Sequence, residues 1–423
     1  MSLVPIRSSA LRSLALDGWL LFATRCTRLF AYGLLSVILV LYLAELGLSD
    51  AEIGLLLTLT LLGDTVISLW ITTTADRLGR RRMLLLGAVL MVLAGLLFAS
   101  SRGFLVLLLA ATFGVISPSG NEVGPFLSIE QAALSQIVPG QRRTGVFAWY
   151  NLVGSFATAL GALCGGALTQ WFQEMGRCGA DAYRPVIVAY AALGALLAVG
   201  FLCVSRDVEV PRIKVDREIQ AATTGKIGLH RSRGVVFRLA GLFALDALGG
   251  GFVIQSIIAY WFHLKFGLEP AALGGVFLGA NLLAGVSALA AGWLAQRIGL
   301  INTMVFTHLP SNLLLMLVPL MPTAWLAVAV LLLRFSISQM DVPTRQSYTM
   351  AVVDPDERSA ASGVTSVARS IGASVSPMLA TALVGTAALA SLPFLLAGGI
   401  KVLYDLLLYR SFVKLRAPEE QHR

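Results

Sequence analysis

The sequence predicts an all-α membrane protein with twelve transmembrane helices in two parallel-repeat six-helix bundles. Hydrophobic residues make up 57% of its 423 residues and charged residues only 13%, whereas soluble domains are about 45–50% apolar and about 25% charged. Each span needs about 20 apolar residues, so the chain has room for about twelve spans. The mean hydropathy of +0.80 also excludes disordered, collagen-like and disulfide-stapled proteins.

Apolar runs between polar breaks place the spans one by one. Their expected ranges are 18–44, 51–75, 83–101, 104–132, 145–172, 185–204, 237–264, 271–295, 301–320, 323–350, 361–387 and 391–412. Pro118, Gly120, Gly124 and Pro125 predict a break in the fourth span. The first apolar run reaches Leu43 without a small-residue cleavage site, so we expect a retained span rather than a signal peptide.

An internal repeat predicts two copies of one bundle. A shift of 220 residues aligns Gly47-Leu48 with Gly267-Leu268, and Asp76-Arg77-Leu78-Gly79 with Gln296-Arg297-Ile298-Gly299. With six spans in each copy, the second copy starts on the same side as the first, so the two bundles are parallel. The predicted parts are an N-terminal bundle at 1–204, a cytoplasmic linker at 205–236 and a C-terminal bundle at 237–423.

The net charge of +9 indicates membrane topology rather than nucleic-acid binding. If the N-terminus is cytoplasmic, 22 lysines and arginines near span ends and in loops lie on that side. Only Arg102, Arg177, Arg184 and Lys265 lie on the opposite side. The positive-inside rule therefore predicts that both termini are cytoplasmic. We expect a bacterial-type inner membrane as the location.

Acidic residues inside spans are candidates for proton coupling, because a charge at the bilayer centre costs about 2.5–3.5 kcal/mol. The candidates are Asp64, Glu122 and Asp246. Asp64 lies twelve residues before Asp76, roughly 18 Å deeper in a helix, where desolvation favours the neutral acid. The alternative for Asp64 is a simple hydrogen bond to Thr60 or Ser68.

Two polar stripes predict inward-facing surfaces. Arg25, Arg28 and Tyr32 share one face of the first span by their i, i+3, i+7 spacing. Further candidates for the cavity are Arg334, Ser338, Asp341 and Arg345, at i, i+4, i+7, i+11 in the tenth span, and Arg369 in the eleventh. Such stripes cannot face lipid, so they either line a substrate cavity or tie helices together.

Three other charged residues are expected to have local roles. Lys401 and Asp405 are four residues apart in the twelfth span, which predicts an ion pair within one helix. Glu130 lies nearer the cytoplasmic end of the fourth span, so we expect it to form a gate or to pair with Arg142 or Arg143.

The loop after the second span identifies a family. Its sequence, Thr72-Thr-Thr-Ala-Asp-Arg-Leu-Gly-Arg-Arg-Arg82, resembles the signature Gly-x-x-x-Asp-Arg-x-Gly-Arg-Arg of the major facilitator superfamily. Thr72 stands at the family's first glycine, and the second copy has Gln296 in place of the acid. The resemblance implies secondary transport, with the first, fourth, seventh and tenth spans lining a central cavity.

The same loop is expected to act as a gate. Its candidate residues are Asp76, Arg77, Gly79, Arg80 and Arg81. Asp76 can pair with arginines and with the N-terminus of a neighbouring helix, and Gly79 permits a tight turn. These contacts would form a breakable latch, present in the first copy alone.

A second resemblance lies in the fifth span. Gly161-Ala162-Leu163-Cys164-Gly165-Gly166 is similar to the Gly-Pro-x-x-Gly-Gly element of drug/proton antiporters in that superfamily. Ala162 replaces the proline, and no lysine or arginine lies between Gly103 and Gln141 to match the basic residue of the efflux branch. The alternative role of Gly161, Gly165 and Gly166 is close helix packing.

We therefore predict proton-coupled efflux of a small organic solute. The alternatives are uptake or exchange of an organic anion by Arg25, Arg28, Arg334 and Arg369, and a non-transporting receptor on the same scaffold. The chain is not expected to be an enzyme or to bind a metal or cofactor, since its histidines and cysteines show no such spacing. The expected partners of this monomer are the lipid bilayer, the solute and protons, with no nucleic acid.

Overall fold

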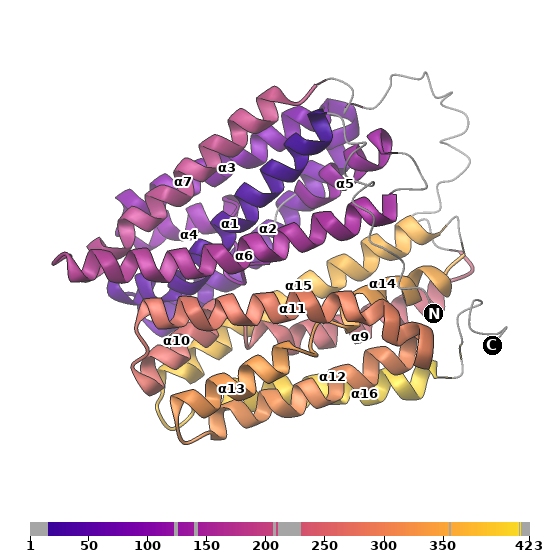
Figure 1. Ribbon diagram of the computed structural model, residues 1–423. Helices are drawn as coiled ribbons and strands as arrows, with labels where there is room; N and C mark the ends of the chain where they lie inside the picture. Colours follow the sequence, from indigo (N-terminus) through magenta and orange to yellow (C-terminus); the bar gives the residue numbers. More distant parts are fainter. Residues whose placement is uncertain are drawn as a thin grey trace. The chain divides into compact units, whose positions relative to one another are not determined.

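The computed structural model describes residues 16–121, 126–138, 143–205, 209, 230–354, 357–413 and 415. Over these residues the protein is all-helical, which confirms the predicted fold class (Figure 1). Ten of the described helices are long and apolar enough to cross a membrane, and two shorter apolar helices cover 104–113 and 324–335.

Helices follow one another with short connections through both repeats. The first repeat contains α1 (Leu16–Glu45), α2 (Asp50–Leu78), α3 (Arg80–Ser100), α4 (Phe104–Phe113), α5 (Phe126–Ile137), α6 (Arg143–Glu174) and α7 (Ala180–Cys203). The second contains α9 (Arg233–Gly251), α10 (Gln255–Phe266), α11 (Pro270–Ile298), α12 (Leu300–Leu317), the 3₁₀ turn η4 (Val318–Leu320), α13 (Ala324–Phe335), α14 (Asp341–Ala351), α15 (Arg358–Gly385) and α16 (Leu392–Phe412).

The chain packs as two compact units. The first comprises residues 1–48, 63–211 and 268–278, and the second comprises 49–62, 212–267 and 279–423. Each unit thus includes the first part of one helix from the other repeat, α11 in the first unit and α2 in the second. The bundle boundaries expected from the linker stay a prediction.

The 220-residue repeat is visible in helix bounds and turn geometry. Helices α2 and α11 have 29 residues each and begin 220 positions apart. The turns that flank them contain Gly47 and Gly267, with φ of +83° and +66°, and Gly79 and Gly299, with φ of +103° and +88°. Because side chains disfavour positive φ, these four glycines allow the same turns in both repeats.

Three spans are interrupted. The fourth is divided into α4 and α5, as the prolines and glycines of that segment predict. Turns at 252–254 and 336–340 likewise interrupt the spans expected at 237–264 and 323–350, although Arg233–Phe266 as a whole is long and apolar enough to cross a membrane. Three glycines precede the first turn and weaken the helix. At the second, Ser336 Oγ donates to the Leu333 carbonyl at 2.7 Å, a local bond that competes with helical hydrogen bonding.

Glycines bring α6 into backbone contact with α1. A Cβ on Gly161 would lie 2.0 Å from the Phe30 carbonyl oxygen, and one on Gly165 would lie 2.2 Å from that of Leu34. In the second unit, Gly372 of α15 packs in the same way against α9. In lipid the hydrophobic effect does not drive helices together, so their association depends on close packing, which small residues permit.

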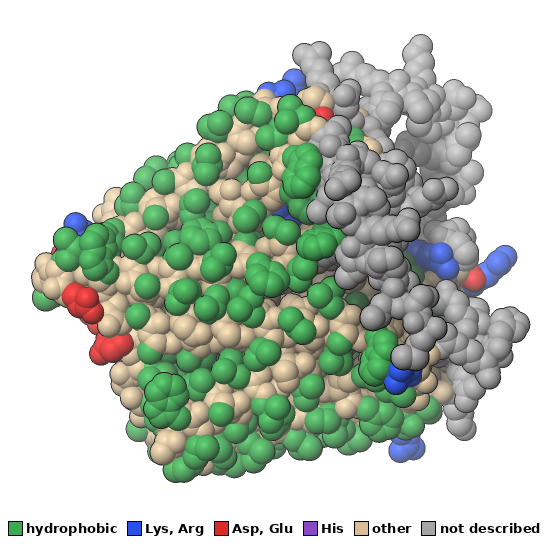
Figure 2. Space-filling model, viewed as in Figure 1, with side chains coloured by type: hydrophobic (Ala, Val, Ile, Leu, Met, Phe, Trp, Pro, Cys, Tyr) green, Lys and Arg blue, Asp and Glu red, His purple; other side chains and the backbone are tan. Residues whose placement is uncertain are grey.

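The surface of the helices is apolar. Figure 2 shows hydrophobic side chains across the visible face, with few charged side chains among them. Val66 and Leu69 of α2 and their repeat counterparts Val286 and Leu289 of α11 are all more than half exposed. Large apolar areas of this kind suit lipid contact rather than water.

Carboxylates cap helix starts at the polar ends of both units. Glu209 accepts hydrogen bonds from the backbone N–H groups of Arg80 and Arg81, at 2.8 and 3.1 Å, where α3 begins. The buried carboxylate of Glu357 accepts three backbone N–H groups, from residues 230 and 231 at 2.7 Å and from Ser232 at 3.0 Å, where α9 begins. Each carboxylate accepts hydrogen bonds from N–H groups that have no partner within the helix. Its negative charge also interacts favourably with the positive end of the helix dipole.

The Glu357 cap makes stability depend on pH. Burial raises the pKa of this carboxyl, but the hydrogen bonds from residues 230–232 outweigh it and hold the pKa below its usual 4.5. Because the pKa is lower in the folded state than in the unfolded state, the ionised carboxylate stabilises the folded protein at pH values above the unfolded-state pKa. This stabilisation is lost as the pH falls through the folded-state pKa. Glu357→Gln should therefore lower the melting temperature at pH 6–8, and its difference from wild type should shrink below about pH 4.5.

Thermal unfolding in detergent across this pH range measures the effect. Glu174→Gln, at an exposed position near the end of α6, is the control and should have little effect at any pH. If the difference in melting temperature between wild type and Glu357→Gln is the same at pH 7 and at about pH 4, the capping role is contradicted.

The close contact of α1 and α6 also predicts a stability difference between two glycine variants. Gly161→Ala should destabilise the protein by about 1–3 kcal/mol, because the added methyl group meets a backbone oxygen that cannot rotate away. Gly241→Ala in α9, where a Cβ meets nothing within 4 Å, should be neutral or stabilising by up to about 1 kcal/mol. Equal melting temperatures for the two variants would disprove the close-packing role of Gly161.

Candidate transport site

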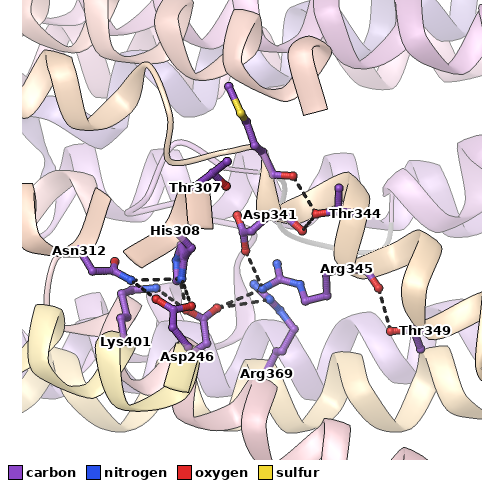
Figure 3. Close-up of polar contacts among 12 residues, drawn as sticks. Asp246, Thr307, His308, Asn312, Asp341, Thr344, Arg345, Thr349, Arg369 and Lys401 are labelled. Atoms are coloured by element: carbon purple, nitrogen blue, oxygen red, sulfur yellow. Dashed lines mark hydrogen bonds and ion pairs between the residues drawn. The ribbon is translucent and has the colours of Figure 1, made fainter. Parts of the chain in front are cut away.

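A buried carboxylate on α9 lies at the centre of the polar interior of the second unit. Asp246 is 4% exposed, and its Oδ1 accepts a hydrogen bond from Lys401 Nζ at 2.6 Å while its Oδ2 accepts one from Arg345 Nη1 at 3.1 Å. Arg369 Nη1 and His308 Nε2 each lie 3.7 Å from the carboxylate. Figure 3 shows Asp246 between Lys401 and His308 on one side and the two arginines on the other.

This network joins five helices of one unit. Asp246 comes from α9, His308 from α12, Arg345 from α14, Arg369 from α15 and Lys401 from α16. Burying an ionised carboxylate alone is costly, so the surrounding cations stabilise it. Removing its charge would therefore weaken the attachment of α14, α15 and α16 to α9 at the same time.

A second carboxylate extends the network on α16. Asp405 is fully buried, with Oδ1 2.8 Å from His308 Nδ1 and Oδ2 accepting from Asn312 Nδ2 at 2.9 Å. The ion pair expected within α16 between Lys401 and Asp405 is therefore wrong. The two side chains instead contact α9 and α12, because tertiary packing offers each a better partner than the other.

The first unit contains a separate buried ion pair. Arg28 of α1 donates two hydrogen bonds to Glu130 of α5, at 2.7 and 2.8 Å, and both side chains are fully buried. The Tyr150 hydroxyl also donates to Glu130, and Thr24 Oγ1 lies 3.3 Å from it. This bidentate pair satisfies both charges without solvent. Arg142 and the side chain of Arg143, the partners expected for Glu130, lie outside the described part of the chain.

Arg25 is held beside this pair. Its Nε donates to the Tyr150 carbonyl at 2.9 Å and its Nη2 to Asn151 Oδ1 at 3.2 Å, with the guanidinium 4.3 Å from the Tyr150 ring centre. Arg25, Arg28 and Tyr32 are all buried. The polar face expected on the first span therefore lies inside its own unit.

The residues expected as one stripe on the tenth span come from two helices. Arg334 ends α13, Ser338 lies in the turn, and Asp341 and Arg345 belong to α14, where they pair at 3.1 Å. All four are buried. Among the described residues, Arg334 Nε and Ser338 Oγ have no hydrogen-bond partner.

The other proton-coupling candidates are placed differently. Asp64 on α2 is partly buried and accepts a hydrogen bond from Ser68 Oγ at 3.3 Å. Glu122 lies outside the described residues.

The loop between α2 and α3 turns at Gly79. Arg81 Nη2 donates to the Leu202 carbonyl at 2.5 Å, and Arg80 is buried. The side chains of Asp76 and Arg77 lie outside the described part of the chain. The gating role expected for these residues stays a prediction.

A cavity of about 200 Å³ adjoins the Asp246 network in the second unit. Arg345 and Arg369 contribute cationic groups to its wall, and Arg369 Nη1 has no hydrogen-bond partner among the described residues. The remaining lining residues are Phe243, Val342, Gln346, Thr349, Met350, Ser362, Thr365 and Ser366. Guanidinium and hydroxyl groups together can bind a carboxylate or phosphate.

Sequence reasoning did not identify three members of these clusters. These are His308, Asn312 and Tyr150, for which no role was predicted from the sequence. The signal for the first two was their i, i+4 spacing within the ninth span, since two polar side chains on one face of an apolar helix predict a shared polar partner.

Comparison with known proteins identifies the family. Residues 21–377, most of the chain, match the sequence profile of the Major Facilitator Superfamily. The chain belongs to this superfamily. The family expected from the loop after the second span is thereby confirmed, and the protein is a secondary transporter rather than an enzyme.

Two relatives differ in how much of the chain they match. An uncharacterized membrane protein of Saccharomyces cerevisiae is 29% identical over 427 residues, which cover 95% of each chain. The quinolone resistance protein NorA of Staphylococcus aureus is 27% identical over 143 residues, covering 34% of this chain and 36% of that protein.

Solved structures share the fold at low sequence identity. A bacterial homolog of the human lysosomal transporter Spinster, in an inward-facing and unoccupied conformation, has a TM-score of 0.69 at 17% identity and covers 99% of this chain and 100% of its own. A D-xylose–proton symporter has a TM-score of 0.72 at 16% identity, covering 96% and 99%.

The Arg28–Glu130 pair predicts a large coupling between two buried charges. Arg28→Met or Glu130→Gln alone should destabilise the protein by about 3–5 kcal/mol, because each leaves a buried group without its partner, and the double variant should lose less than the sum. The free energy of unfolding of the four proteins measures this coupling.

The exposed Arg102–Asp181 pair, 3.8 Å apart, is the control for this cycle. Its coupling should be about 0–1 kcal/mol. Additive effects at Arg28 and Glu130 would show that the buried pair is not an energetic unit.

Proposed function

We propose that this member of the superfamily exports a small organic solute in exchange for protons, by alternating access. The Asp246 carboxylate carries the proposal, because cations from three helices and a histidine from a fourth surround this one buried acid. Intramembrane ionisable residues mark ion pathways and proton relays in transporters. A proton on Asp246 would remove the charge that holds Lys401 and Arg345 and so change the equilibrium between conformations.

Two other acids take part in the proposed coupling. Asp64 has a hydroxyl partner, Ser68, that suits both the ionised and the neutral acid. Glu122 completes the set on the fourth span. In this mechanism, protons and solute compete for the intramembrane acids, and the proton gradient thereby drives solute movement.

Two similarities support export as the direction. The Gly161–Gly166 element resembles that of drug/proton antiporters, and its glycines pack α6 closely against neighbouring helices. The partial match to the NorA quinolone resistance protein points the same way.

Topology and gating complete the proposal. The asymmetry of loop charges supports cytoplasmic termini in a cell inner membrane, with the protein acting as a monomer. We assign the conformational latch to the loop containing Asp76, Arg77, Gly79, Arg80 and Arg81, where Arg81 already bonds the end of α7.

Uptake or exchange of an organic anion is the second candidate function. The cavity lined by Arg345 and Arg369 favours it, because a guanidinium nitrogen without a hydrogen-bond partner among the described residues, Arg369 Nη1, can donate to a carboxylate or phosphate ligand. Arg334, whose Nε has no hydrogen-bond partner among the described residues, is the further candidate for this purpose. Arg25 already donates to Tyr150 and Asn151, and Glu130 already neutralises Arg28. Opposite directions of flux distinguish this candidate from export.

Flux in proteoliposomes tests the proposed function. A panel of ethidium, a fluoroquinolone, a monocarboxylate and a sugar phosphate is assayed with and without an imposed pH gradient. Cationic or zwitterionic compounds should move against the proton gradient. Asp64→Asn and Asp246→Asn should each reduce this gradient-driven flux by about tenfold or more, because the neutral amide cannot take up a proton.

Asp181→Asn, at an exposed acid near the start of α7, is the control and should transport normally. Normal membrane insertion of all variants is checked by yield and melting temperature. Gradient-driven flux that is unchanged in Asp64→Asn and Asp246→Asn would disprove the assignment of these acids, and net uptake of the anions would favour the second candidate.

A further inference from the structure

His308 is the one histidine among the described residues that is buried within a span and faces two carboxylates. It is 4% exposed, with Nδ1 2.8 Å from Asp405 Oδ1 and Nε2 3.7 Å from Asp246 Oδ1. Asn312, one turn further along α12, donates to the other oxygen of Asp405. The imidazole therefore lies between an acid on α16 and an acid on α9.

The distances assign different roles to the two ring nitrogens. Nδ1 is within hydrogen-bond distance of Asp405, which favours a proton on that nitrogen. The opposite nitrogen, Nε2, is then the acceptor of the neutral ring, because a neutral imidazole carries one N–H donor. A proton added at Nε2 points toward Asp246, so the charged ring would face a carboxylate at both ends.

Lys401 faces the same oxygen of Asp246. Its Nζ lies 2.6 Å from Oδ1, the atom that His308 Nε2 approaches at 3.7 Å. A protonated His308 would thus compete with Lys401 for Oδ1, while Arg345 and Arg369 face Oδ2. Lys401 and Asp405 both belong to α16, so this exchange would alter how α16 is attached to α9 and α12.

Other groups around the histidine set its charge environment. The Tyr404 ring of α16 packs edge-on against the imidazole at 5.8 Å. Asp341 of α14 pairs with Arg345 on the far side of Asp246. The described groups around the ring are thus two acids, one amide, one phenol and one lysine.

We infer that His308 is a proton-binding site of this transporter, with Asp405 orienting the ring and Asp246 receiving the proton-bearing Nε2 in exchange for Lys401. The inference rests on proton coupling as proposed above, and it adds a site on α12 and α16 to the three acids assigned there. A proton bound at Nε2 would be held between two carboxylates, Asp405 at Nδ1 and Asp246 at Nε2.

Histidine-selective ¹⁵N NMR of the full chain in lipid tests this site directly, with protons themselves as the probe. The chain has only 4 histidines, and the spectrum of His308→Gln identifies the His308 signals. Nε2 should change from acceptor to protonated nitrogen within the range of about pH 5–8 over which histidines titrate. In Asp405→Asn the midpoint should move to lower pH by about one unit or more, because the anion that stabilises the charged ring is gone.

His263→Gln, at the end of α10, is the control and should leave the His308 signals unchanged. The inference would be overturned if the His308 ring kept one protonation state throughout the titration. It would also be overturned if the midpoint were the same in wild type and in Asp405→Asn. Either result would leave the proposed function to be judged by the flux panel.

A transport readout separates a proton site from a structural tie. In proteoliposomes with a panel compound that wild type moves, His308→Gln should reduce pH-gradient-driven flux by about tenfold and solute exchange without a gradient by a clearly smaller factor. Loss of exchange to the same extent would indicate a merely structural histidine and would overturn the inference. If His308 titrates as expected but wild-type flux does not depend on the pH gradient, the proposed proton coupling is disproved and the proton-binding site is retained.

Discussion

The cost of an unpaired charge away from water determines how both units are built. Each unit buries ionised side chains within helices that are otherwise apolar, and each neutralises them through contacts between helices rather than within one. In the first unit, Arg28 and Glu130 form a closed bidentate pair. In the second, Asp246 is shared among several cations. The two arrangements differ in what they can do.

A closed pair and a shared carboxylate respond differently to a proton or ligand. Both oxygens of Glu130 are occupied by one guanidinium and a tyrosine hydroxyl, so the pair resists rearrangement. Asp246 has close contacts with Lys401 and Arg345 and two further donors, Arg369 and His308, that remain at 3.7 Å. Competition among donors allows alternative pairings of similar energy, which a transporter needs to change conformation.

The backbone framework of the two repeats is more alike than their polar interiors. Helices α2 and α11 share length, flanking glycine turns and exposed apolar positions, while Asp64 on α2 lies 220 positions before Ala284 on α11. Helix packing and lipid contact constrain the first set of features equally in both copies. The polar residues are free to diverge, and among the described residues more buried ionisable side chains lie in the second unit than in the first.

The sequence alone determined the fold class, the repeat and the family. Span length, the excess of apolar residues and the glycine turns around Gly47 and Gly79 are local properties, set by bilayer thickness and backbone sterics. The break in the fourth span was also readable, because Pro118 and Gly120 disfavour a helix wherever they occur. Several charged residues expected inside spans are buried, among them Arg28, Glu130 and Asp246, since lipid excludes unpaired charges.

Only the tertiary structure decided which of those charges meet. Lys401 and Asp405 were expected to pair along one helix, yet they contact Asp246 and His308 from α9 and α12. The expected stripe on the tenth span was divided by the turn at 336–340. Partner choice depends on distances between residues about 100–150 positions apart in the chain, and helical periodicity carries no information about the rotation of one helix against another.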